Sequence, residues 1–116
     1  MTNLITAAML ACLSQIESGD NDSAVGSRGE RTRYQIGVEE LRQHPTLLKH
    51  PESKGIATIV ATEIWEHRAW HFMALHNRQP TPIEMYALWN APAKADHPSK
   101  AVLERAQRFA NLLDKL

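Results

Sequence analysis

Apolar residues recur at helical spacing in several stretches of the chain, and turn-forming residues separate these stretches. The first stretch places apolar side chains on one face of a helix: Ile5, Met9, Cys12 and Ile16. Thr2 or Asn3 can cap this helix at its start, and Gly19 is expected to end it. Glu17 then lies in the last turn.

Four more helices are expected further along the chain. A short one over about 38–44 stops at Pro45, and a longer one runs from about 51 to 77 with apolar residues at helical spacing. Thr81 is followed by Pro82 and by Glu84 three residues after the cap, a combination that satisfies the free amides of a first helical turn. A final amphipathic helix begins after Ser99, which can cap it.

Between the first two expected helices, residues 19–37 are rich in Asp, Asn, Ser, Gly and Arg. Only Val25, Tyr34 and Ile36 suit a strand there. We therefore expect a mainly α domain of about five helices, with a loop or minimal β-hairpin after the first helix.

Length, composition and charge limit the possible partners. A chain of 116 residues that is 43% hydrophobic is expected to form a single domain over 1–116. Basic and acidic residues number 13 each, so no basic field favours a nucleic-acid partner. Met1 is not followed by a basic region, and the apolar stretch 4–13 runs into the residues described next, so neither a signal peptide nor membrane insertion is expected. The single cysteine, Cys12, is interpreted as a small buried hydrophobe.

A block of residues around the end of the first helix carries the candidate chemistry. It consists of Glu17, Ser18, Gly19, Asn21, Ala24, Val25, Gly29, Gln35 and Ile36. In this order and spacing it resembles the lysozyme-like lytic transglycosylases, the superfamily of soluble lytic transglycosylases and goose-type lysozymes. A second block, Ala-Leu-Trp-Asn-Ala-Pro at 87–92, is similar to a later segment of that family that lines the same cleft.

The resemblance implies a lysozyme-like fold that cleaves the glycan strands of bacterial peptidoglycan. The bond would be the β-1,4 link between N-acetylmuramic acid and N-acetylglucosamine, with Glu17 as the catalytic acid and base and no cofactor. The product would carry a 1,6-anhydromuramoyl end, because the substrate's own N-acetyl group replaces a second carboxylate. The resemblance further implies substrate contacts for Ser18, Tyr34, Gln35, Tyr86, Trp89 and Asn90.

Elementary electrostatics gives Glu17 a reason to be the acid. A carboxylate in the last turn of a helix faces the negative end of the helix dipole, which disfavours the anion. Partial burial in a cleft acts in the same direction, so we expect a raised pKa.

Several positions depart from the family pattern or have a purely structural alternative. Trp89 replaces the usual Tyr, and Thr32 replaces a Gly in the segment before Gln35. Trp89 can stack on a sugar ring, and Tyr86 can supply the missing hydroxyl, but both also suit the core. Ser18 can bond within the loop, and Asn90 can cap a helix end.

A hydrolytic, lysozyme-like outcome would need a second carboxylate to activate water. Asp20 and Asp22 follow the helix end too closely and are interpreted as turn residues. Glu30 has the reach to serve, although a solvated loop charge is the favoured interpretation.

Three other classes of function remain open. Glu63, His67 and His71 share one helix face at a spacing that could ligate a metal. The usual zinc-hydrolase pattern is missing, and no further ligand is evident near the two histidines, so we expect no metal. A non-catalytic glycan-binding relative would not need Glu17, and a helical interaction module would not need the loop block. The expected location is the periplasm, cell wall or exterior, where the substrate lies; the sequence sets no oligomeric state.

Overall fold

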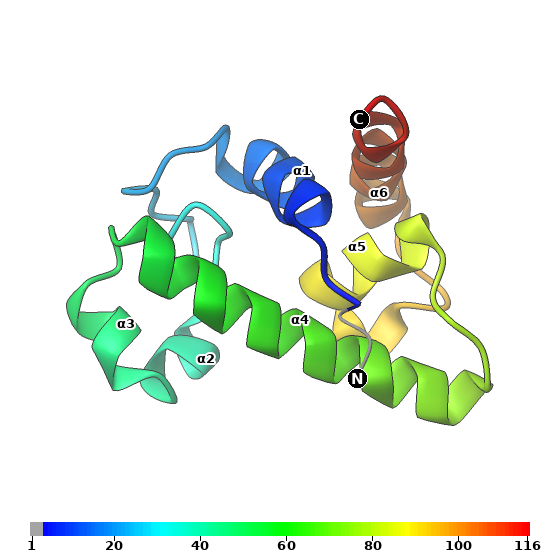
Figure 1. Cartoon of the computed structure of the whole chain (residues 1–116), viewed down its shortest axis with the longest axis horizontal. Helices are drawn as coiled ribbons and strands as arrows, with labels where there is room; N and C mark the ends of the chain where they lie inside the picture. The colour runs from blue at the N-terminus through cyan, green and yellow to red at the C-terminus, as the bar shows by residue number, and fades with distance from the viewer. Residues whose placement is uncertain (1–3) are drawn as a thin grey trace. The chain divides into compact units, whose positions relative to one another are not determined.

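The computed structural model describes residues 4–116, and this part of the chain is mainly helical, as the sequence predicts (Figure 1). Its helices are α1 (Ala7–Ser18), α2 (Val38–Arg42), α3 (Pro45–Lys49), α4 (Lys54–His76), α5 (Pro82–Asn90), the 3-10 helix η1 (Pro92–Lys94) and α6 (Lys100–Asp114). The expected caps Thr2 and Asn3 lie outside the described residues. Within them, the Thr6 hydroxyl accepts a hydrogen bond from the Met9 amide at 3.1 Å and caps α1.

The predicted helix starts at Thr81 and Ser99 are confirmed. Thr81 accepts a hydrogen bond from the Glu84 amide, and the Glu84 carboxylate accepts one from the Thr81 amide, which completes a capping box. Arg78 also holds both Glu84 oxygens, at 2.7 and 2.8 Å. This hydrogen bond lowers the pKa of Glu84 from 4.5 to about 2. The Ser99 hydroxyl accepts from the Val102 amide and starts α6.

Helix α3 was not expected, since Pro45 was interpreted as a stop. Proline ends the preceding helix, but it also suits the first position of the next helix. The amide at that position makes no hydrogen bond within the helix, so proline, which lacks an amide hydrogen, loses nothing there. Leu47, near the middle of α3, is fully buried, so the short helix contributes to the core.

The chain divides into two compact units, which we describe separately. The first unit contains Met1–Cys12 and Ile64–Leu116, and the second contains Leu13–Glu63. The boundaries therefore fall inside α1 and α4.

The core of the first unit is aromatic. Helix α5 packs against α6, and the indole of Trp65 on α4 lies edge-on to Phe109 of α6 at a ring distance of 5.8 Å. The indole nitrogen of Trp65 donates to the Met85 carbonyl at 2.7 Å, so this fully buried side chain leaves no polar atom unpaired. Burial of each such ring stabilises the fold by about 1.5–3 kcal/mol.

The second unit holds residues 19–37 as an ordered loop. Two isolated bridges, Val25 with Arg31 and Arg31 with Ile36, are its only sheet-like pairings, and residues 4–116 contain no extended strand. This agrees with the predicted loop or minimal hairpin. Ile36 and Leu13 anchor the loop and the end of α1 in the core.

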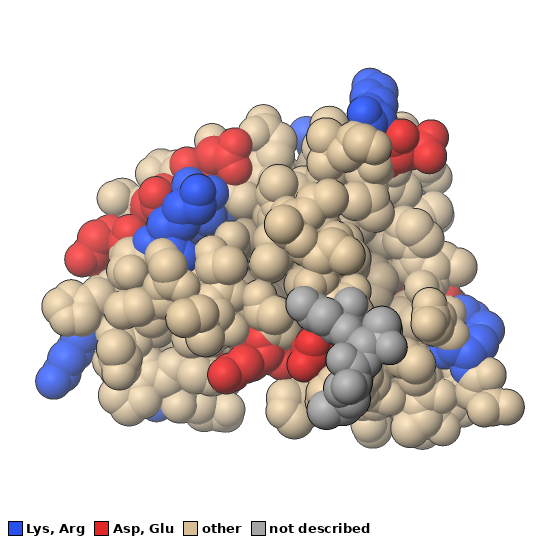
Figure 2. Space-filling model, viewed as in Figure 1, with Lys and Arg blue, Asp and Glu red and all other residues tan. Residues whose placement is uncertain are grey.

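Three further features concern the single thiol, the length of the helices and the surface charge. Cys12 is buried, with 4% of its surface exposed, and burial raises the pKa of its thiol. Within 4–116 we find no helix with both the length and the apolar character needed to cross a membrane. On the face shown in Figure 2, outside the grey atoms, basic and acidic side chains are interspersed.

Candidate functional site

Glu17 lies one residue before the end of α1, in its last turn, and its side chain is partly exposed. The helix end beneath it is fixed by several bonds. The Gly19 amide donates to the Gln15 carbonyl at 3.0 Å, with Gly19 in the left-handed conformation (φ +63°) that commonly ends a helix. The buried Ser14 hydroxyl donates to the Asp20 carboxylate at 2.7 Å. Glu17 therefore lies on a helix end that is held by hydrogen bonds, and its side chain is partly exposed.

Ser18 ties the loop to this helix end. Its hydroxyl donates to the Arg33 carbonyl at 2.7 Å and accepts from the Asn21 amide at 3.0 Å. The structure thus shows Ser18 in the loop-bonding role that was the alternative to sugar contact. Through these bonds it holds the turn around Arg33 next to the end of α1.

Arg33 fixes the loop from its other side. Its guanidinium binds both oxygens of Asp22, at 2.7 and 3.3 Å, and lies 3.9 Å from an oxygen of Asp20. The hydrogen bond to Asp22 is the main reason that the pKa of Arg33 is raised. Asp20 and Asp22 are turn residues, as expected, and both pair with this side chain. The role of Arg33 was not predicted, although its position shortly after two aspartates could have suggested it.

The turn from Thr32 to Gln35 has an unusual backbone. Thr32 (φ +76°) and Gln35 (φ +56°) both adopt the left-handed conformation, and Thr32 is 1% exposed. For a β-branched residue this conformation is a true outlier, and such strain often occurs at functional sites. Thr32 is the position where the resembled family has glycine, the residue that adopts this conformation freely. Its hydroxyl accepts from the Tyr34 amide at 3.1 Å, which helps to fix the turn.

Gln35 is held in one orientation by the strained turn. Its side-chain nitrogen donates to the Thr32 carbonyl at 3.0 Å, which turns its oxygen toward Gly26. A side chain at Gly26 would lie 2.5 Å from that oxygen and 2.6 Å from a carboxylate oxygen of Glu30. The side-chain oxygens of Gln35 and Glu30 therefore both lie close to Gly26, and a Cβ atom there would displace the flexible ends of these two side chains.

Glu30, interpreted as a solvated loop charge, is partly exposed in the loop, and its carboxylate accepts from the Arg28 amide at 2.8 Å. The Glu30 carbonyl also accepts from the Gly26 amide at 2.8 Å. Glu30 is thus a fixed acceptor beside Gln35.

Tyr34, expected at the substrate, is instead buried. Its side chain is 3% exposed, and its hydroxyl is hydrogen-bonded to the Thr58 hydroxyl on α4 at 2.8 Å. An aromatic side chain between polar neighbours suits either a core or a binding surface, and the structure places this one in the core.

The second block, in the first unit, is also more buried than expected. Tyr86 is fully buried and Trp89 is 6% exposed, so the core-packing alternative describes both. Trp89 meets Trp65 edge-on at 5.9 Å and lies under the guanidinium of Arg68 at 5.7 Å. Arg68 also donates to the Leu88 and Trp89 carbonyls in the last turn of α5, where a positive charge is favourable. Asn90, the last residue of α5, is partly exposed and stays a predicted contact.

Two of the residues considered as metal ligands have other neighbours in the structure. Glu63 lies 3.9 Å from His44, and His67 packs its ring edge-on against Trp70. Within 4–116 no group of three or more His, Cys, Asp or Glu side chains is arranged to hold a metal ion. His71 lines a hollow of about 400 Å³ in the first unit.

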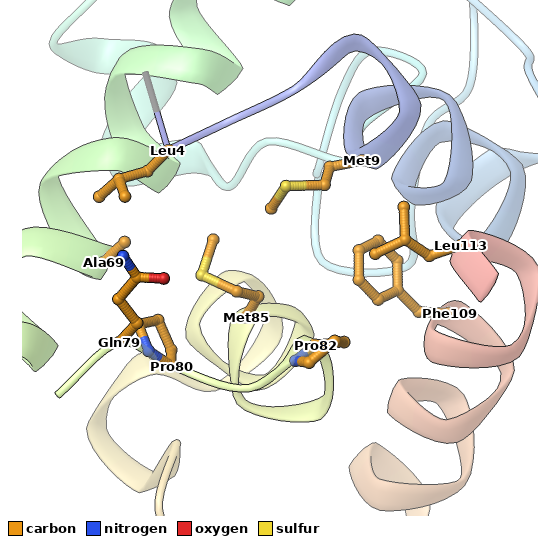
Figure 3. Close-up of a pocket in the computed structure, with 9 residues that line it drawn as sticks. All are labelled: Leu4, Met9, Ala69, Gln79, Pro80, Pro82, Met85, Phe109 and Leu113. Atoms are coloured by element: carbon orange, nitrogen blue, oxygen red, sulfur yellow. The ribbon is translucent and has the colours of Figure 1, made fainter. Parts of the chain in front are cut away.

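The first unit also contains an apolar pocket of about 170 Å³. Met9, Met85, Phe109 and Leu113 converge on it, and Gln79 is its polar side chain (Figure 3). The remaining lining residues are Leu4, Ala69, Pro80 and Pro82. The lining contains no acid or base, so this pocket does not suit proton-transfer chemistry.

Comparison with models of protein families, with curated proteins and with solved structures finds no match.

Proposed function

We propose that this protein cleaves the glycan strands of bacterial peptidoglycan as a lytic transglycosylase, with Glu17 as its acid and base. The observation that carries the proposal is the setting of Glu17: a partly exposed carboxylate on a fixed helix end, joined through Ser18 to a strained, hydrogen-bonded turn. The resemblance of the block to the lysozyme-like family supplies the reaction.

The proposed reaction uses one carboxyl group twice. Protonated Glu17 gives its proton to the bridging oxygen while the N-acetyl oxygen of the muramoyl residue attacks the anomeric carbon, and the N-acetylglucosamine side leaves with its hydroxyl restored. The Glu17 carboxylate then takes the proton of the muramoyl 6-hydroxyl, whose oxygen attacks the same carbon and displaces the N-acetyl oxygen. A 1,6-anhydro ring forms and Glu17 regains its proton. No cofactor enters this scheme.

Gln35 is the group best prepared to contact the glycan near Glu17. Its amide is locked by the Thr32 carbonyl, so it does not need to be ordered when a sugar binds. Asn90 is a second proposed contact. Since the substrate is a wall polymer, the proposed place of action is the periplasm, cell wall or exterior.

One observation favours a second candidate, hydrolysis. Glu30 is a fixed acceptor beside the Gln35 oxygen, and two neighbouring acceptors can orient a water molecule between them. A water activated by Glu30 would give a reducing muramoyl end rather than an anhydro end.

Digestion of purified peptidoglycan followed by mass analysis tests the proposal. We expect anhydromuramoyl products from the wild type and none from Glu17→Gln, which keeps the shape and removes the proton. Glu104→Gln is a matched control, because Glu104 is an exposed glutamate on α6. Circular dichroism would verify that both variants are folded. Activity of Glu17→Gln above about a tenth of wild type would refute Glu17 as the acid.

If bound glycan persists in Glu17→Gln but the wild type releases no product, the protein is a glycan binder rather than an enzyme. Reducing ends that vanish with Glu30→Gln would instead establish hydrolysis.

A further inference from the structure

The pocket that Met9, Met85, Phe109 and Leu113 line serves no step of the proposed reaction. It belongs entirely to the first unit, whereas Glu17 belongs to the second. Its walls come from α4, α5, α6, the linker between α4 and α5, and the chain around the start of α1, and they enclose about 170 Å³ (Figure 3). In packed protein interiors, voids larger than a water molecule are few. The pocket is therefore a candidate binding site of its own.

One wall of the pocket is fixed by the linker between α4 and α5. Pro80 and Pro82 line this wall, and their rings restrict the backbone. Thr81 between them forms the capping box with Glu84, and Arg78 binds both carboxylate oxygens of Glu84. The linker is thus held in place without help from a ligand, so binding does not have to order it.

The other walls are adaptable and suit an aromatic ring. Met9 and Met85 point toward each other in the pocket, and methionine is unbranched, flexible and favourable in contact with aromatic rings (Figure 3). Phe109 also lines the pocket, and its ring already lies 5.8 Å from the rings of both Trp65 and Tyr86. A further ring in the pocket would extend this aromatic cluster.

The lining also limits the charge and polarity of a ligand. Among the described residues that line the pocket none is charged, so a charged ligand would lose its hydration without gaining an ion pair. Gln79 supplies the polar side chain, and its amide lies beside Ala69 at the edge of the pocket (Figure 3). That amide has no hydrogen-bond partner within residues 4–116, and it can both donate and accept.

The volume sets the size of the ligand. An apolar cavity of about 150 Å³ holds one benzene ring, whereas pockets for drug-sized molecules measure about 300–1,000 Å³. We infer that this pocket binds a neutral molecule of the phenol class, one aromatic ring with a hydroxyl group. The ring lies among Met9, Met85 and Phe109, and the hydroxyl bonds to the Gln79 amide. This inference does not depend on the proposed glycan cleavage.

The first test locates the ligand by NMR, with carbon-13 in the methionine methyl groups and p-cresol as the probe. We expect the Met9 and Met85 resonances to shift until the pocket is saturated, because an aromatic ring shifts the signals of groups that it contacts. Met73 on α4 does not line the pocket and should not shift. Met9 and Met85 resonances that stay in place would overturn the inference.

A matched pair of variants checks that the pocket itself takes the ligand. Leu113→Trp places an indole in the space meant for the ring and should abolish the shift at Met85. Leu103→Trp alters an exposed leucine of the same helix outside the pocket and should leave the shift unchanged. Circular dichroism verifies that both variants are folded. An undiminished shift in folded Leu113→Trp would place p-cresol elsewhere and overturn the inference.

The second test examines the chemistry of the ligand. A ring contact is worth about 2- to 10-fold in affinity, so p-cresol should bind more tightly than 1-hexanol by about that factor, and benzoate should not bind. The ratio of p-cresol to toluene affinity should be about 2- to 10-fold greater in the wild type than in Gln79→Leu, which loses the hydrogen bond. Tighter binding of 1-hexanol or of benzoate, or an equal ratio in Gln79→Leu, would overturn the assignment to phenols.

Discussion

Replacing Thr32 by glycine and by alanine isolates the strain in the loop beside Glu17. Both variants lose the hydroxyl that accepts the Tyr34 amide and the buried methyl group. An unpaired buried amide costs about 1–3 kcal/mol and a buried methyl about 0.8 kcal/mol, so Thr32→Ala should lose about 2–4 kcal/mol of unfolding free energy. Alanine keeps a Cβ atom and therefore keeps the penalty of the left-handed backbone at φ +76°.

Glycine removes that penalty. The left-handed conformation costs an L-residue about 1–2 kcal/mol, and glycine's greater freedom in the unfolded chain offsets about 0.5–1 kcal/mol of the gain. Thr32→Gly should therefore be at least as stable as Thr32→Ala, with a difference of about 0–1.5 kcal/mol. At an ordinary helical position the order is the opposite, with alanine more stable by about 0.5–1 kcal/mol.

Urea unfolding followed by circular dichroism measures the difference in unfolding free energy between the two variants. The midpoints can be compared directly if the unfolding free energies of both variants fall equally steeply with urea concentration. Thr62 on α4 supplies the matched control, because it is a helical threonine whose hydroxyl also makes a hydrogen bond, to the Thr58 carbonyl. There the alanine variant should be the more stable one. An alanine variant at position 32 that is more stable than the glycine variant by about 0.5–1 kcal/mol, as at an ordinary helical position, would show that the backbone there carries no strain.

Three further predictions concern other elements. Trp89→Ala should lower the unfolding free energy by about 3–5 kcal/mol, measured by urea unfolding, because the indole is buried against Trp65; unchanged stability with weakened glycan binding would restore the surface role first expected. Glu84→Gln should cost about 1 kcal/mol at neutral pH. Because the folded-state pKa of Glu84 is lowered to about 2, this cost should be complete above about pH 4.5 and should vanish as the pH falls toward 2; a cost independent of pH would contradict the ion pair with Arg78. Glu30→Gln should change the rate of glycan cleavage by no more than a few-fold if the anhydro product dominates, as product analysis over time would show; a greater loss would assign Glu30 to the reaction.

The sequence predicted those parts of the fold that depend on neighbours along the chain. The capping box at Thr81 and the cap at Ser99 are local hydrogen-bond patterns, so the residue types alone determine them. The position of Glu17 in a last helical turn followed from Gly19 in the same way. Pro45 shows where local patterns do not suffice, because the same residue ends one helix and begins another. The burial of Leu47 in the core stabilises this second helix, and that burial is a tertiary contact.

Features that depend on distant contacts were not predictable. Tyr34, Tyr86 and Trp89 suit a sugar surface or a core equally well by residue type, and only tertiary packing decides for the core. The left-handed backbone at Thr32 contradicts the preference of a β-branched residue and arises from the surrounding hydrogen bonds. The Nε donor of Arg31 is buried without a partner within residues 4–116, which becomes visible only when the bonds of its neighbours are known.

The single thiol at Cys12 makes the lifetime of the first helix measurable. Cys12 is 4% exposed and burial raises its pKa, so a disulfide reagent can reach a reactive thiolate only after this part of α1 has opened. At low reagent concentration the labelling rate then reports the fraction of molecules in which the helix is open, and at high concentration it reports the opening rate itself. Because Glu17 lies in the last turn of the same helix, five residues after Cys12, these rates set a limit on how long the proposed catalytic end of the helix persists between openings.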